Sequence, residues 1–323
     1  MKNLRIKLIK ISSYIFNSLN LKKYKKLNSQ LTTLDKNLVL TGHETFQCRN
    51  LWLKKGYDFL KSKKKFKDLD SVVFLGVGKN MVSSIRFWMR SFDIIDDNDN
   101  ITEFGHLILA DDGFDPYLED EGTLWILHYK LVVNNFSSTY SLLFNEFRKE
   151  KIEFTKESYV KFVSRKCVEN SIKEPKENTI LDDFSVMSKL YIRSESQTKD
   201  KEDNYSGLLT DLNLINNIGI KGEEILVIEN SEKINIPSEV ILFCILETGG
   251  FESSINFNKI ESDYNNVGSV FAINRLGLVN KIEEIVKNEK SIIYSDYAGI
   301  KELQFKKKIK PSTVLEKYYG KKN

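Results

Sequence analysis

The sequence predicts a mainly α-helical fold with small β elements. We expect a winged helix-turn-helix domain followed by a second mixed α/β domain. A second winged helix is the alternative for the latter. Residues 37–150 have a mostly helical pattern and are rich in aromatic side chains. Within them, a glycine-containing turn separates two amphipathic segments between Asp68 and Ile95. Farther along, Ile225–Ile228 is a short aliphatic run of the kind that forms a buried strand.

Composition sets the number of domains and excludes several protein classes. With 323 residues and 41% hydrophobic content, the chain is long enough for about two domains of about 150 residues each. We place a basic N-terminal extension at 1–36, the winged helix-turn-helix domain at 37–150 and the second domain at 151–323. An aromatic content of 11% with four prolines argues against disorder. No run approaches 18 apolar residues, so we expect no membrane span.

The cysteines indicate a reducing compartment. There are three of them, Cys48, Cys167 and Cys244, which are far apart and show no CxxC spacing. This pattern excludes a disulfide framework and a zinc ribbon. We therefore expect a cytoplasmic protein.

Charge is unevenly distributed along the chain, although the net charge is only +4. Residues 1–34 contain eight Lys or Arg and no acid, and seven lysines lie within 54–67. Between Arg90 and Lys130 the sign reverses: the segment is rich in Asp and Glu and contains no Lys or Arg. Basic stretches beside a recognition-type helix favour a surface that faces phosphates, with solvated loops as the alternative. The apolar residues of 1–36 recur at helical spacing between lysines, which predicts a helix that extends from the body, docks on it, or lies on a membrane or nucleic acid.

Residues 68–95 predict a helix-turn-helix. A short first helix, capped by Asp68 or Asp70, carries Val72, Val73 and Leu75. Gly76 and Gly78 supply the sharp turn. The second helix, about 80–92, has an apolar face that consists of Val82, Ile85, Trp88, Met89 and Phe92. Its other face is basic and polar, which suits a DNA major groove. The residues that we predict to contact DNA are Lys79, Asn80, Ser83, Arg86 and Arg90. An amphipathic helix pair that binds no DNA is the alternative.

Shorter patterns predict the remaining elements. Ile101–Leu109 predicts a strand or short helix that closes the winged fold, and Thr155 predicts a helix start. Residues 194–205 are polar and predict a loop. In the second domain we expect helices at 178–192, from Pro237 and Ser238 onward, and at 267–279, whose end resembles the close of a second winged-helix recognition helix.

Several blocks of sequence, taken together, resemble the SspB family. They span most of 42–319 and are Gly42–Arg49, Leu51–Tyr57, Leu75–Val82, Tyr117–Asp120, Thr123–Tyr129 and Ser295–Ile300. The resemblance implies a role in bacterial DNA phosphorothioation, in which sulfur replaces a non-bridging phosphate oxygen on one DNA strand. It implies duplex DNA, a cysteine desulfurase, an ATPase and an ATP-pyrophosphatase-like protein as partners. It also implies that the SspB-like member nicks DNA, without assigning the catalytic residues.

The first candidate catalytic group is His43, Glu44 and Arg49. Cleavage of a phosphodiester needs a base, stabilisation of the negative charge and protonation of the leaving oxygen. The histidine could act as base, the glutamate as base or metal ligand, and the arginine could bind a phosphate through two hydrogen bonds. The alternative is structural: Glu44 caps a helix and pairs with Arg49 or a lysine.

The second candidate group is Asp115, Glu119 and Asp120, as ligands of a divalent metal, Mg²⁺ or Mn²⁺. If this segment is helical, the first two carboxylates share one face, and Pro116 is compatible with a first turn. The alternative is that acids gather at a helix N-terminus for electrostatic reasons. His128 lies in an apolar run and is expected to be a core histidine.

These patterns lead to one functional hypothesis and two rivals. The hypothesis is a DNA-binding, strand-nicking subunit of a bacterial phosphorothioate-modification and defence system, which would make the chain a metal-dependent nicking endonuclease. The first rival is a non-catalytic adaptor that recruits the sulfur-transfer proteins to DNA. The second is a protein-interaction module whose basic surface meets an acidic partner.

Overall fold

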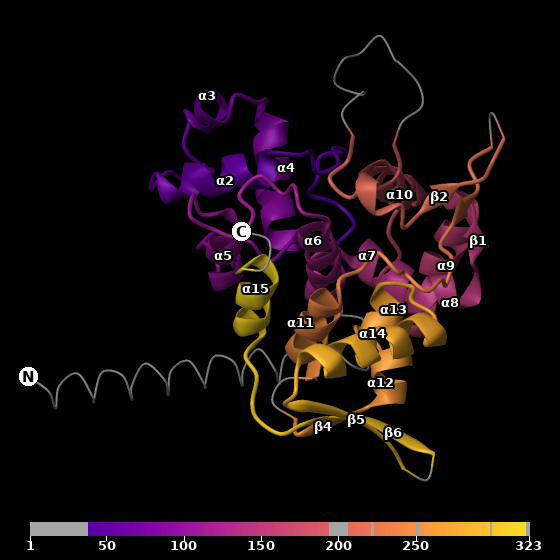
Figure 1. Ribbon diagram of the computed structural model, residues 1–323. Helices are drawn as coiled ribbons and strands as arrows, with labels where there is room; N and C mark the ends of the chain where they lie inside the picture. The colour runs from indigo at the N-terminus through magenta and orange to yellow at the C-terminus, as the bar shows by residue number, and fades with distance from the viewer. Residues whose placement is uncertain (1–37, 194–205, 221–222, 250–251, 298, 321–323) are drawn as a thin grey trace, which may run out of the picture.

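The computed structural model describes residues 38–193, 206–220, 223–249, 252–297 and 299–320 (Figure 1). The predicted basic extension at 1–36 and the predicted loop at 194–205 lie outside these residues. None of the helices in the described ranges combines the length and the apolar character that a bilayer crossing requires.

The described chain is mainly helical, as the sequence predicts. Its first half contains α2 (Trp52–Lys61), α3 (Ser71–Leu75), α4 (Lys79–Ser91), α5 (Glu103–Leu109), α6 (Glu121–Asn134), α7 (Ser138–Leu142), the π-helix η1 (Leu143–Phe147) and α8 (Arg148–Glu150). The second half contains α9 (Lys156–Glu169), α10 (Glu177–Tyr191), the 3₁₀-helix η2 (Thr210–Leu212), α11 (Ser238–Gly249), α12 (Phe257–Ser262), α13 (Val267–Val270), α14 (Arg275–Asn288) and α15 (Pro311–Gly320).

The strands form two small antiparallel sheets. One contains β1 (Glu153–Phe154), β2 (Asn216–Asn217) and β3 (Leu226–Val227) in the order β1-β3-β2. The other contains β4 (Ser254–Asn256), β5 (Ile292–Tyr297) and β6 (Ile300–Phe305) in the order β4-β6-β5. The fold class is therefore confirmed at the level of a helical protein with small β elements.

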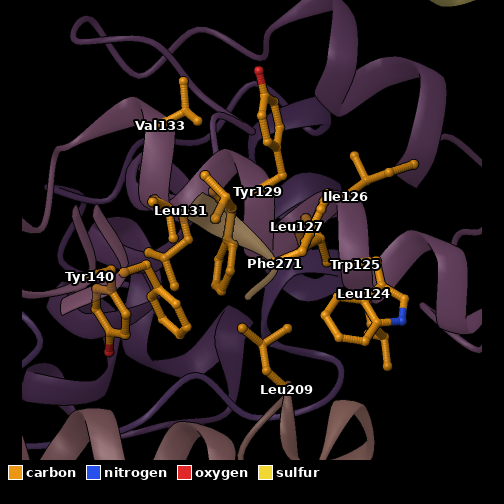
Figure 2. Close-up of a cluster of buried hydrophobic side chains, with 14 of the residues drawn as sticks. Leu124, Trp125, Ile126, Leu127, Tyr129, Leu131, Val133, Tyr140, Leu209 and Phe271 are labelled. Carbon is orange, nitrogen blue, oxygen red and sulfur yellow. The ribbon is translucent and has the colours of Figure 1, made fainter. Parts of the chain in front are cut away.

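Helix α6 forms the centre of the core. Its residues 122–133 are all buried, which is expected for a helix that is apolar on every side. Figure 2 shows its side chains packed among Tyr140 of α7, Leu209 and Phe271. The C-terminal helix returns to the start of α6, where the hydroxyl of Tyr318 donates to Asp120. The buried core thus continues across residue 150, and the division into domains there stays a prediction.

His128 of α6 is a satisfied core histidine, as predicted. It is fully buried, and its Nε2 lies 2.9 Å from the carbonyl oxygen of Val270. A carbonyl oxygen only accepts, so Nε2 carries the hydrogen. The hydroxyl of Tyr191 then donates to Nδ1 at 2.7 Å. Burial lowers the pKa of His128 to about 3.

We expect this imidazole to stay neutral while the protein is folded. The unfolded chain, with a pKa of about 6.5, binds the proton more readily. The contribution of His128 to the free energy of unfolding is therefore complete above about pH 6.5, and it falls by about 1.4 kcal/mol per pH unit toward pH 3. An NMR titration of the histidine ring signals from pH 8 to 4.5, assigned with His128→Gln, should leave the His128 signal unmoved. A titration midpoint above pH 5 would contradict the burial argument.

The helix-turn-helix elements form where the sequence places them. Gly76 ends α3 with φ +63°, and Gly78 precedes α4. The predicted apolar face of α4 is buried and packs on α2 and α6. In α3, Leu75 is buried, but Val73 is 79% exposed, because a helix of five residues covers only a small part of the core.

The sequence predicts a strand or a short helix at 101–109, and the short helix is confirmed. Thr102 accepts a hydrogen bond from the amide of Gly105 and starts α5, while Ile101 forms an isolated antiparallel bridge with Ile95. A wing at this position is not confirmed. One predicted element is wrong in detail. The predicted helix 267–279 is two helices, α13 and α14, because Ala272 has φ +51° and Asn274 caps a new helix through the amide of Gly277.

Candidate nucleic-acid interface

A groove of about 390 Å³ lies between the outer face of α4 and the loop 41–46. It contains residues that the sequence assigned to separate roles: Glu44 from the predicted catalytic group, and Ser83, Arg86 and Arg90 from the predicted DNA-contacting face. The full lining is Thr41, Gly42, Glu44, Phe66, Lys67, Val82, Ser83, Arg86, Phe87, Arg90 and Phe136. Three cationic side chains and one carboxylate therefore surround the same hollow.

The outer face of α4 presents the predicted polar residues to solvent. Lys79, Asn80 and Ser83 are exposed, while Arg86 and Arg90 are half-buried with side chains 33% and 18% exposed. These five residues form a polar stripe along α4. The stripe follows from helical periodicity, because its positions recur mostly every three or four residues opposite the buried apolar face. Lys79 and Asn80 lie in the first turn of α4, Ser83 and Arg86 in its middle and Arg90 in its last turn.

An acidic loop partly neutralises the two arginines. Asp99 lies 2.9 Å from Nε of Arg86 and 2.9 Å from Nη2 of Arg90. Arg90 also donates to the carbonyl oxygen of Asp97 at 2.6 Å. The loop is held by Asp96, which accepts from the amides of Asn98 and Asn100. Although its burial alone would raise the pKa of Asp96, these hydrogen bonds and the charge of Arg90 lower it. The arginines thus face a fixed carboxylate at the groove.

His43 anchors the loop that carries Glu44. It is buried, and its Nδ1 accepts from the backbone amide of Thr45 at 3.2 Å. Nε2 therefore carries the hydrogen, which it donates to Asp183 of α10 at 2.7 Å. Thr139 of α7 donates to the second carboxylate oxygen of Asp183. Both ring nitrogens are used inside the fold, so this geometry fits a positioning role for His43 better than a general base.

The backbone of this loop is strained at the groove. Glu44 and Thr45 have φ +49° and +64°, a region that side chains other than glycine, asparagine and aspartate rarely adopt. Gly42 has φ +116°, and a Cβ there would lie 2.7 Å from Cδ2 of Phe87. Each such residue costs about 1–3 kcal/mol and persists only where its surroundings enforce it. The buried His43–Asp183 contact supplies that enforcement and holds Glu44, which is exposed, at the groove.

Arg49 lies apart from the groove lining. Its guanidinium is 5.3 Å from the ring centroid of Trp52 and 5.9 Å from that of Phe46. Its backbone bridges to Gly207. The structure therefore places His43 and Glu44 beside the groove, and it places Arg49 on an aromatic surface outside the lining residues.

The second predicted group lies at the N-terminus of α6 and holds the fold together. Asp115 is buried, and its carboxylate accepts from the amides of Glu119 and Asp120 and from the hydroxyl of Thr123. Asp120 caps α6 by accepting from the amide of Gly122. The segment from Asp115 to Asp120 is not helical, so the expected common helix face for the first two carboxylates is wrong.

The carboxylates of Asp115 and Asp120 already serve as hydrogen-bond acceptors within the fold. Three donors take up most of the acceptor positions of Asp115, so its use as a metal ligand stays a prediction. In the part of the chain that the structure describes, no three His, Cys, Asp or Glu side chains come together as a possible metal site.

Sequence reasoning missed three residues that the structure brings to this region. Lys67 lines the groove and belongs to the lysine-rich run 54–67, so charge patterning was a usable signal for it. Asp99 pairs with both arginines, and its acidic run was visible in the sequence. Asp183 lies 140 residues from His43, and no local pattern connects them.

Comparisons with known proteins agree with this architecture. Residues 40–319 match the family described as "Protein of unknown function (DUF4007)". No curated protein matches the chain in sequence. Two crystal structures, one of SspB and one of magnesium ion-bound SspB, superpose with TM-scores of 0.76 and 0.77. Each is 25% identical to the chain, and the match covers 86% of this chain and 87% of the other. The chain therefore belongs to the DUF4007 family and has an SspB-like fold.

Proposed function

We propose that this protein is a DNA-binding component of a bacterial DNA phosphorothioate-modification system, and that the groove beside α4 holds the DNA backbone. The observation that carries the proposal is the convergence of Lys67, Ser83, Arg86 and Arg90 on one groove, with Lys79 exposed at the start of the same helix. Guanidinium and ammonium groups bind phosphates through charge-assisted hydrogen bonds, and a concave surface lets several of them contact the same DNA backbone.

The similarity to SspB supports the pathway part of the proposal. It extends over most of both chains, and a component of such a system needs partners that supply sulfur. We therefore propose duplex DNA, a cysteine desulfurase, an ATPase and an ATP-pyrophosphatase-like protein as partners, in the cytoplasm.

Binding requires an exchange of anions at the arginines. A DNA phosphate would take the place of Asp99 on Arg86 and Arg90, and it would keep their hydrogen bonds with little change in side-chain position. Ser83 and Lys67 would then contact neighbouring backbone oxygens. Contacts of this kind position the duplex and carry no sequence information by themselves.

Removing the competing carboxylate should strengthen DNA binding. Asp99→Asn keeps the shape of the loop and removes the charge that opposes a phosphate, so we expect affinity for a 30-base-pair duplex to rise about 3- to 10-fold. A charge-assisted hydrogen bond contributes about 1.5–3 kcal/mol. The variant weakens the bonds between Asp99 and the two arginines, so a DNA phosphate loses less of this energy when it displaces residue 99. Fluorescence anisotropy at fixed salt measures the change, with the exposed Asp112→Asn as the matched control. Weaker binding by Asp99→Asn would show that the arginines need Asp99 in order to bind DNA.

Strand nicking is the second candidate activity, favoured by the strained placement of Glu44. This carboxylate is the acidic residue among the groove-lining side chains. Mg²⁺ is commonly bound by one or two carboxylates together with substrate phosphates, and Glu44 fits that arrangement. A bound metal would neutralise charge on the phosphate, while Arg86 and Arg90 would orient it.

Relaxation of supercoiled plasmid with Mg²⁺ or Mn²⁺ separates nicking from an adaptor role. We expect open-circular product from the wild type and a loss of at least about 100-fold in Glu44→Gln with DNA affinity retained. Glu119→Gln, an exposed carboxylate outside the groove, is the control and should nick normally. If the wild-type protein binds DNA but nicks it with neither metal, nicking is excluded and the adaptor role is supported. In that role the groove binds DNA without cleaving it.

A further inference from the structure

The second sheet and its helices have the connectivity of a winged helix. The chain order is α11, β4, α12, α13, α14, β5 and β6, and the strand order is β4-β6-β5. Helix α12 packs on β4 and β6, and α14 packs on β5. Ile255, Leu303 and Tyr294 lie opposite one another in the antiparallel register, and Leu303 is fully buried. The wing that the sequence suggested after α4 has its counterpart here, in the β5–β6 hairpin.

The outer face of this hairpin ends in an exposed apolar pair. Tyr297 of β5 lies opposite Ile300 of β6, and the two residues are 81% and 57% exposed. Both are placed on the face away from Ile292 and Leu303, since neighbouring residues of a strand alternate between faces. Figure 1 shows the hairpin projecting from the body at the end of the molecule opposite α4. Folding therefore gives no reason for an aromatic and an aliphatic side chain at this tip.

The base of the hairpin is basic. Lys306, Lys307 and Lys310 directly follow β6 and are exposed. The backbone at the start of this run is fixed, because the amide of Lys306 donates to the carbonyl oxygen of Ser291 and the amide of Phe305 to that of Ser253, both at 2.8 Å. The apolar tip of the hairpin suits the minor groove of a DNA duplex, into which apolar side chains can insert. The lysines at its base suit the phosphates on either side of that groove.

Helix α14 is less suited to face DNA. Glu283 and Glu284 lie exposed on its outer side, Arg275, at its start, is paired with Glu261 at 2.6 Å, and Lys287 is exposed in its last turn. The hairpin also carries carboxylates, but Asp296 is paired with Lys301 at 3.4 Å and Glu302 accepts a hydrogen bond from Gln304. Because three exposed lysines follow the hairpin, it provides the more favourable surface for phosphates.

We infer that the β5–β6 hairpin is a second duplex-DNA contact, in which Tyr297 and Ile300 enter the minor groove and Lys306, Lys307 and Lys310 bind the flanking phosphates. The inference rests on the proposed DNA-binding function and adds a surface far from the α4 groove. Since the two surfaces are separate, losses of affinity from variants of each should add.

Two sets of variants of the full chain test the hairpin, with binding of a 30-base-pair duplex measured against salt concentration. Lys306→Gln, Lys307→Gln and Lys310→Gln together should reduce the slope of log K against log salt by about 2 to 3. Tyr297→Ala with Ile300→Ala should weaken binding about 10-fold while leaving that slope unchanged. The exposed lysines of α9 and the following loop give the control, Lys161→Gln with Lys173→Gln, which should change neither quantity.

The outcomes separate this inference from the proposed function. Wild-type protein that binds no duplex would overturn both. Normal binding by the hairpin variants, while Arg86 and Arg90 variants lose affinity, would overturn the hairpin contact alone and assign the exposed pair to a protein partner. If the control variant, Lys161→Gln with Lys173→Gln, lost DNA affinity to the same extent, the hairpin contact would also be overturned. The loss in the hairpin variants would then reflect the net charge of the protein only.

Discussion

Replacing Asp183 with alanine is expected to lower the free energy of unfolding by about 2 to 5 kcal/mol, because two buried donors lose their acceptor and each unsatisfied buried group costs about 1–3 kcal/mol. Asp183 is 2% exposed and accepts from His43 and Thr139. Without it, a buried ring N–H and a buried hydroxyl lose their acceptor. Urea denaturation followed by tryptophan fluorescence measures the change.

The neighbouring residue offers a matched control. Asp182 is exposed on the same helix, so Asp182→Ala should change stability by less than about 0.5 kcal/mol. Asp183→Asn, which keeps an acceptor for His43, should cost less than alanine. If Asp183→Ala and Asp182→Ala were equally stable, the anchor that we assign to the groove loop would be wrong.

Reversing the charge of both groove arginines is expected to weaken duplex DNA binding by about 100-fold or more. Arg86→Glu with Arg90→Glu removes two phosphate contacts, each worth about 1.5–3 kcal/mol as a charge-assisted hydrogen bond, and a loss of 2.7 kcal/mol is already 100-fold. It also places two carboxylates beside Asp99 and Glu44. Anisotropy with a labelled duplex measures the affinity.

Stability and net charge must be controlled in this experiment. The pairs with Asp99 are partly exposed, so their loss should cost about 1 kcal/mol or less of stability. Arg165→Glu removes an arginine that is likewise paired, with Glu150 at 2.6 Å, and it should leave DNA affinity within about 3-fold. If Arg165→Glu and the double groove variant lost DNA affinity equally, the groove would not be the DNA-binding surface.

Several helices were predictable where local patterns decide the structure. Helix α4 forms because its apolar residues recur every three or four positions, and each of them is buried. The start of α9 was predictable from Thr155, which caps it through Ser158. Such features depend on neighbours within one or two turns.

The β5–β6 hairpin could not be located from local patterns. Residues 101–109 and the β5–β6 region are both short apolar stretches with a glycine, and periodicity does not separate short strands from short helices. Thr102 as a helix cap decides the first case, and pairing of β6 with β4, about 47 residues earlier, decides the second. Strand pairing at that distance leaves no local signature.

The candidate site was predictable in its residue types more than in its geometry. The polar stripe of α4 follows from the sequence, whereas the contact of His43 with Asp183 is made across 140 residues. Asp115 shows what short spacing leaves out: three acids close in sequence predict a metal site, but spacing does not reveal that two of them also hold the start of α6.

The central claim is that the cations of the α4 groove contact DNA phosphates, and the salt dependence of binding tests it most directly. Affinity for a 30-base-pair duplex should be measured from 50 to 250 mM salt for the wild type and for Arg86→Gln with Arg90→Gln. Each phosphate contact contributes about 0.9 to the slope of log K against log salt, so the double variant should lose between about 1 and 2 units of slope. An unchanged slope, with wild-type affinity, would mean that these arginines serve only the fold and that DNA, if bound, lies elsewhere.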